Sequence, residues 1–212
     1  SIDASGAEPI GAETEELSRR LLYGLSLGHA VKHFGQGAVL ILVPEVKATL
    51  GLSDVAVGAM FGARDAASGV ANVPAGLLTD MYRHRVPLLL MISMALVGAA
   101  YLMIGLSSWY WLTLVALIVI GAGTSLWHAP AFSELAVRYP QRVGFAMAAH
   151  STGAQIGNTT APVLVGLLLG GIGVLGMPCP KIQCCLFLCL IKTLQACYKD
   201  KKAICGYKTC LT

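Results

Sequence analysis

Apolar residues fall into five long runs that are separated by short polar segments: residues 21–43, 55–79, 87–106, 110–133 and 143–170. Each run has about the 20 residues that an α-helix needs to cross a lipid bilayer. Spanning β-strands would instead be about ten residues long with alternating polarity, whereas these runs are apolar on every face. The pattern predicts an all-α membrane protein whose transmembrane bundle occupies residues 19–176. Residues Ile182–Tyr198 would make a sixth crossing, although they are short and Lys192 interrupts them.

Polar signals mark the ends of these runs. Pro44 and Glu45 end the first run, Ser53 is a candidate N-cap for the second, and Pro87 stands at the start of the third. Residues 1–18 are polar and acidic, unlike a secretory signal. With this N-terminus in the cytoplasm, six basic residues of the connections lie inside (Arg19, Arg20, Arg83, Arg85, Arg138 and Arg142), and Lys47 lies outside. This distribution follows the positive-inside rule.

Composition agrees with a lipid environment. The chain has 212 residues, of which 56% are hydrophobic and 12% are charged, and its mean hydropathy is +0.70. A soluble domain has about twice that share of charged residues. The net charge of +4 is spread between apolar runs, so it forms no basic stripe for nucleic acid. We therefore expect a multi-pass integral protein of the plasma (inner) membrane.

The C-terminal segment, residues 177–212, differs from the rest. All seven cysteines lie between Cys179 and Cys210, together with several lysines. Their spacing fits neither a disulfide framework nor paired zinc ligands. Three interpretations remain open: a tail foreign to the ancestral fold, a redox or metal-binding tail, and a real sixth helix.

Glycines recur at a spacing of four in Gly24/Gly28, Gly58/Gly62, Gly153/Gly157 and Gly166/Gly170. Such spacing allows helix backbones to approach closely in lipid. The simpler explanation is that glycine is common in membrane helices, but four pairs favour close helix packing.

Ionisable residues inside the runs are the candidates for function. Lys32 lies in the middle of the first run with His29 and His33 on the same helical face, and Arg64 and Asp65 lie in the middle of the second. Adjacent residues on a helix point about 100° apart, so we expect Asp65 to pair with Lys32 across the two helices. The group would line a polar cavity, or it would be a static ion pair that locks the helices together.

Two further histidines, His128 and His150, lie at similar depths near the cytoplasmic ends of their runs. Histidine changes protonation in the physiological range, which suits a proton relay, but either residue could equally be a neutral core residue. Pro130 predicts a bend near His128. The spacing of His29 and His33 gives too few ligands for a metal centre, and no hydrolase or phosphate-binding motif occurs. We expect no enzyme activity, no cofactor and no metal.

Two segments resemble the major facilitator superfamily of secondary transporters. Gly76-Leu-Leu-Thr-Asp80-Met-Tyr-Arg83-His-Arg85 is similar to the family signature G-x-L-x-D-R-x-G-R-R, with departures at Met81, Arg83 and His84. The fifth run resembles the Gly-Pro motif that is associated with antiporters, through Gly153, Gly157, Pro162 and Gly166. Leu126–Gly166 also looks like the drug-efflux, fosmidomycin-resistance-like branch.

The resemblance covers residues 19–175. It implies the first part of a fold of two six-helix halves around a site at the middle of the membrane. Asp80 and Arg85 would brace a cytoplasmic gate. Glu134 would pair with the basic loop residues, or form an ordinary helical pair with Arg138.

The implied function is proton-coupled transport of a small organic solute, in the efflux direction, with this chain as a fragment of the transporter. Lys32, Arg64, Asp65, His29, His33, His128 and His150 would line the path. Its partners would be the bilayer, the solute, protons, and a missing C-terminal half or a second copy. The alternative is a non-transporting membrane module that oligomerises or pairs with another polypeptide.

Overall fold

The computed structural model describes residues 10–107 and 109–175, and every regular element in those ranges is a helix. The long helices are α1 (Ile10–Leu50), α2 (Asp54–Met81), α3 (Val86–Leu106), α4 (Tyr110–Arg138) and α5 (Val143–Leu175), and a 3₁₀ turn, η1, spans Arg83–Arg85. The all-helical expectation is therefore confirmed for the part of the chain described. The proposed sixth crossing and the segment 177–212 lie outside it.

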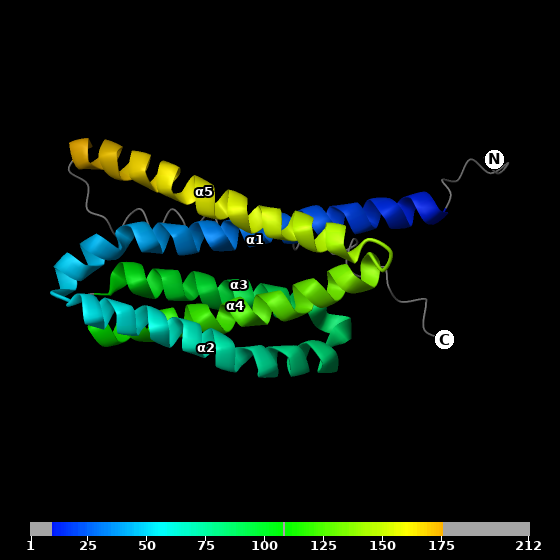
Figure 1. The fold of residues 1–212 in the computed structure, drawn as a ribbon, viewed down its shortest axis with the longest axis horizontal. Coiled ribbons are helices and arrows are strands. Elements are labelled where there is room, and N and C mark those ends of the chain that lie inside the picture. Colours follow the sequence, from blue (N-terminus) through cyan, green and yellow to red (C-terminus); the bar gives the residue numbers. More distant parts are fainter. Residues whose placement is uncertain (1–9, 108, 176–212) are drawn as a thin grey trace.

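The first helix is longer at both ends than the apolar run predicts. It begins at Ile10, inside the acidic segment, where Glu15 and Glu16 pair with Arg19 and Arg20 one turn later. Such pairs stabilise an exposed helix end. It also continues through Pro44, which was expected to end it, and the C-terminal part of α1 turns away from the rest (Figure 1). A proline removes one backbone hydrogen bond and bends a helix without necessarily ending it.

Capping residues set the other boundaries. Gly51 ends α1 with a φ of 62°, a left-handed conformation that glycine adopts without strain. The backbone N–H of Leu52 then donates to the carbonyl of Lys47 at 2.9 Å, which closes the helix end. The Ser53 side chain accepts from the backbone N–H of Ala56 at the start of α2, as expected of an N-cap. Pro87 lies in the first turn of α3.

The five helices form two groups. Helix α1 packs mainly against α5, and α4 lies between α2 and α3 (Figure 1). The chain reverses direction at each connection, so α1, α3 and α5 run one way and α2 and α4 the other. One apolar cluster joins α1, α3, α4 and α5 around Trp127 and Leu135, and a second joins α2, α3 and α4 around Val97 and Ile120.

Small residues bring α1 and α5 into backbone contact. A Cβ atom on Gly153 would collide with the carbonyl of Ser26, and one on Gly157 would collide with the carbonyl of Ala30. This glycine pair therefore packs closely, as its spacing predicts. In contrast, Gly58, Gly62 and Gly166 have nothing within 4 Å of an added Cβ among the described residues. The prediction of close packing is wrong for those three within the described residues, because their helix faces point away from the other described helices.

Much of the outer surface is apolar, while the interior holds polar groups. Lys32 and His150 are completely buried. Large apolar side chains are exposed on every long helix, among them Leu40, Val70, Leu88, Trp111 and Leu167. Two stretches, Arg83–Leu106 and Tyr110–Arg138, are long and apolar enough to cross a membrane by length and composition. Composition thus supports two of the five expected crossings, whereas α1 and α2 carry charges in their middles.

Replacing Gly157 with valine should separate α1 from α5, since the added side chain has no room against the α1 backbone. We expect the free energy of unfolding to fall by about 1–3 kcal/mol, as for other overpacked sites. The matched control is Gly166→Val on the same helix, which should have little effect. Both free energies of unfolding are measured by titrating the detergent-solubilised variants with SDS and monitoring circular dichroism. Equal losses for the two variants would contradict this packing.

Candidate functional site

Lys32 is the centre of a polar cluster in the middle of the bundle. Its Nζ lies 2.7 Å from Nε2 of His128 on α4, and no carboxylate pairs with it in the described ranges. A charge buried in this way is costly unless hydrogen bonds compensate it. The His128 ring is therefore the group that compensates the Lys32 ammonium.

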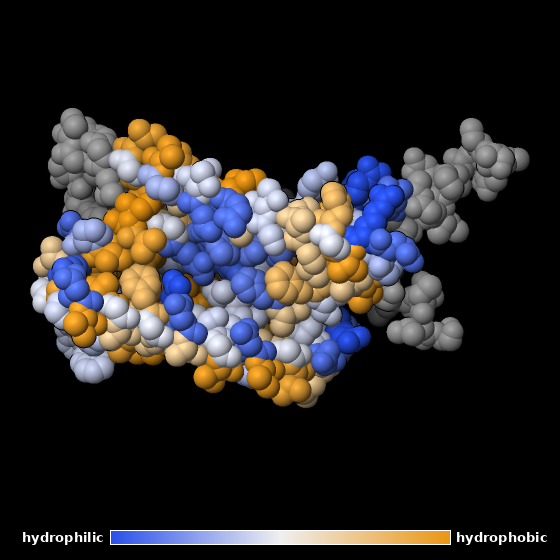
Figure 2. Space-filling view, in the orientation of Figure 1, coloured by the Kyte–Doolittle hydropathy of each residue, from blue (hydrophilic) through white to orange (hydrophobic). Residues whose placement is uncertain are grey.

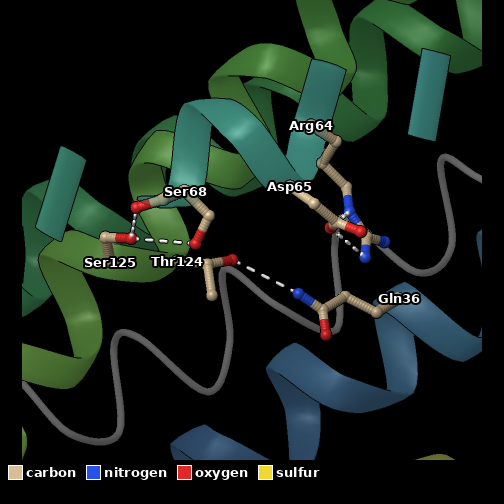
Figure 3. Close-up of polar contacts among 6 residues, drawn as sticks. All are labelled: Gln36, Arg64, Asp65, Ser68, Thr124 and Ser125. Atoms are coloured by element: carbon tan, nitrogen blue, oxygen red, sulfur yellow. Dashed lines mark hydrogen bonds and ion pairs between the residues drawn. The ribbon is translucent and has the colours of Figure 1, made fainter. Parts of the chain in front are cut away.

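The expected pair of Lys32 with Asp65 is wrong. Asp65 accepts two hydrogen bonds from the neighbouring Arg64 guanidinium, at 2.7 and 2.9 Å, and its side chain is 67% exposed. The Arg64 side chain bends toward Asp65, so its guanidinium reaches the carboxylate of the adjacent residue, as Figure 3 shows. The guanidinium also lies 5.4 Å from the centre of the Phe61 ring. Arg64 and Asp65 thus form a local pair on α2, outside the Lys32 cluster.

His29 connects three helices within this cluster. Its Nδ1 lies 3.0 Å from the carbonyl oxygen of His150 on α5, and its Nε2 lies 3.2 Å from Nε2 of His128 on α4. A carbonyl oxygen only accepts hydrogen bonds, so the proton of neutral His29 is assigned to Nδ1 and its Nε2 carries a lone pair. The His29 and His150 rings are stacked with centroids 4.1 Å apart. Together with Lys32, the structure therefore brings together four residues that the sequence places on three separate runs.

The contact with Lys32 bears on the tautomer of His128. With Lys32 as an ammonium, which only donates, Nε2 of His128 is assigned as the acceptor and offers its one lone pair to Lys32. Nε2 of neutral His29 also carries a lone pair and lies 3.2 Å from Nε2 of His128. A hydrogen bond between the two imidazoles therefore requires an added proton.

The remaining histidines have distinct surroundings. His33 is half-buried and its Nδ1 lies 3.3 Å from Oδ1 of Asn158 on α5. Both ring nitrogens of His150 are buried without a hydrogen-bond partner among the described residues. His33 thus joins the edge of the cluster, whereas His150 contributes its carbonyl and its ring face.

Several polar residues near the cluster were missed at the level of sequence. Gln36 on α1 donates to Oγ1 of Thr124 on α4 at 3.2 Å, and Ser125 donates to the carbonyl of Ser68 on α2 at 2.7 Å (Figure 3). Asn158 on α5 was also missed. One signal was available, because residues 29, 32, 33 and 36 lie at the spacing of a single helical face. Figure 2 shows a hydrophilic patch in the middle of the face that carries α1 and α5, with more apolar surface on either side of it.

The loop motif between α2 and α3 lies away from this cluster. Asp80 pairs with Arg83 at 3.1 Å, both exposed, and Arg85 lies in the same 3₁₀ turn. Glu134 pairs with Arg138 at 3.2 Å, and the two side chains are only 21% and 10% exposed. Of the two partners considered for Glu134, the structure has the helical one.

Comparison with known proteins relates the chain to a family of transporters. The sequence model of the Major Facilitator Superfamily matches residues 25–191. The Fosmidomycin resistance protein of Escherichia coli (strain K12) is 22% identical over 153 residues, which cover 72% of this chain. The match covers 37% of that relative, so this chain spans well under half of its length.

The contact between Lys32 and His128 predicts that substitutions of the two residues change the free energy of unfolding in different directions. His128→Leu leaves the ammonium buried without an acceptor and should lower the free energy of unfolding by about 1–3 kcal/mol. Lys32→Met removes the buried charge and should be neutral or stabilising. In the Lys32→Met background, His128→Leu should therefore cost less than it does alone.

The double-mutant cycle is measured by SDS unfolding of the purified chain. His84→Leu, in the exposed 3₁₀ turn, is the matched control and should stay within about 0.5 kcal/mol of the wild type. Additive losses for Lys32→Met and His128→Leu would contradict the compensation of the ammonium by the imidazole.

Proposed function

The chain belongs to the major facilitator superfamily, and we propose that it supplies one helical bundle of a secondary transporter for a small organic solute. In this family the solute site lies near the middle of the membrane, between two bundles that move against each other. The polar face of α1 is the surface of this chain that fits such a site. The second bundle would come from further sequence or from a second copy.

The cluster around Lys32 is the observation that carries this proposal. Ionisable groups within membrane helices are costly and usually serve transport or proton transfer. Lys32 and His29 come from the middle of α1 and His128 from the C-terminal half of α4, and His33 and Gln36 extend the cluster along α1. Because no carboxylate pairs with Lys32 among the described residues, an acidic group on the solute would supply the missing charge. We therefore propose an anionic solute.

Proton coupling is supported by the contact between His29 and His128. Their facing Nε2 atoms, 3.2 Å apart, would share one added proton in a hydrogen bond. An ammonium and an imidazolium repel each other, so protonation of the imidazoles and the charge state of Lys32 would be linked. His150 and His33, which flank the His29 ring at centroid distances of 4.1 and 4.6 Å, complete the proposed proton path. Arg64 and Asp65 on α2 would stand at its margin.

Direction and orientation are further parts of the proposal. The Gly-Pro motif of α5 resembles that of antiporters, and the matched Escherichia coli relative is named for resistance, which export of a compound would confer. We propose export across the plasma (inner) membrane with the N-terminus in the cytoplasm, as the basic connections favour. Asp80, Arg83, Arg85 and Glu134, at the cytoplasmic ends of α2 and α4, would then brace the closed gate.

A chimera tests this function. In it, residues 25–175 of this chain replace the matched segment of the Escherichia coli relative, in a strain that lacks that relative. We expect the chimera to restore resistance to fosmidomycin, and Lys32→Met to abolish it, because the solute would lose its counter-charge. The readout is the lowest concentration of the compound that stops growth.

Two controls accompany the chimera. His84→Gln should keep full resistance, and immunoblots of membranes should show equal amounts of each variant. A chimera that is present in the membrane but confers no resistance would count against the proposed transport. Solute flux through proteoliposomes that contain this chain alone, as a monomer, would contradict the need for a second bundle.

A further inference from the structure

Three imidazoles of the cluster lie close enough to hold one metal ion. One ring nitrogen from each of His29, His33 and His128 lies within 4.8 Å of the others. The first two lie one turn apart on α1, and the third comes from α4. The sequence reveals the closeness of only the first two, so from the sequence there are too few ligands for a metal centre.

The hydrogen bonds already present prepare these rings as ligands. Nδ1 of His29 faces the carbonyl of His150, and Nδ1 of His33 faces Oδ1 of Asn158. Each Nδ1 proton is thereby assigned to an oxygen acceptor, which leaves Nε2 with its lone pair. Metal-binding histidines in proteins are oriented by the same kind of outer hydrogen bond.

The distances suit a tetrahedral ion. With Zn–N bonds of 2.0–2.1 Å, two ligand nitrogens lie about 3.3 Å apart, and Nε2 of His29 and Nε2 of His128 are 3.2 Å apart. His33, whose ligand nitrogen lies within 4.8 Å of the other two, would move inward to complete the set. It is half-buried, as is His128, so an ion could enter from the polar face.

We propose that His29, His33 and His128 form a site for a divalent transition metal ion of the zinc type, which competes with Lys32 for Nε2 of His128. The ion would displace the Lys32 hydrogen bond, because that nitrogen has a single lone pair. A water or a solute group would take the fourth position. A bound ion would also fix α1 to α4 at the middle of the bundle.

Because Lys32 competes with the metal ion for His128, the proposal predicts opposite effects on metal affinity for substitutions of Lys32 and of the histidines. Removal of the ammonium in Lys32→Met should tighten metal binding by about tenfold or more, because a positive charge near the ion is lost. Loss of a ligand in His128→Gln or His29→Gln should weaken it by at least a hundredfold. Asn158→Leu frees the His33 ring and should weaken binding by about 10–100-fold.

The test is a titration of the purified full chain with Co²⁺, followed by its visible absorption, and then displacement by Zn²⁺. The chain carries no polyhistidine tag, and its seven cysteines are blocked with N-ethylmaleimide, because thiolates bind the same ions. We expect one ion per chain with nitrogen ligands. His84→Gln, the matched control in the exposed turn, should bind like the wild type.

Two results would overturn the proposal: unchanged binding by His128→Gln, and weaker binding by Lys32→Met. The second variant gains affinity if the proposal holds, so a folding defect cannot imitate the expected result. Binding is measured without transport, so a chimera that fails to confer resistance would leave this inference intact.

Discussion

A lysine that is completely buried, with an imidazole in place of a carboxylate as its partner, determines how the middle of this bundle is built. An amine in such a place needs an acceptor, and Nε2 of His128 is the one the structure provides. That contact fixes the tautomer of His128, and the carbonyl of His150 fixes that of His29. Nε2 of His29 and Nε2 of His128 consequently face each other 3.2 Å apart, and the Lys32 amine contacts the second of these nitrogens.

This arrangement depends on how closely α5 approaches α1. The glycines at 153 and 157 allow the α5 backbone to touch the carbonyls of Ser26 and Ala30. Only then do the His150 carbonyl and the Asn158 side chain come within hydrogen-bond distance of His29 and His33. The motif of the fifth helix thus supports the polar cluster through packing rather than through chemistry of its own.

The distribution of polarity agrees with membership of a transporter family. Lys32 and His150 are buried, whereas leucines and valines of all five long helices are exposed. Such a chain gains little from folding in water, because its apolar surface stays outside. In lipid the apolar exterior carries no cost, and the buried polar groups become the interactions that specify how the helices pack.

The sequence alone predicted the five long helices of the described residues, since a run of about twenty apolar residues leaves the backbone no alternative to a helix in lipid. It also located the ionisable residues, because a charge inside such a run stands out without knowledge of its neighbours. It could not pair them. Lys32 was expected to meet Asp65, yet Asp65 folds back onto Arg64 and Lys32 meets His128. Partners on different helices depend on helix rotation and depth within a few ångströms, and periodicity fixes neither; only the packing of α1 against α4 and α5 decides them.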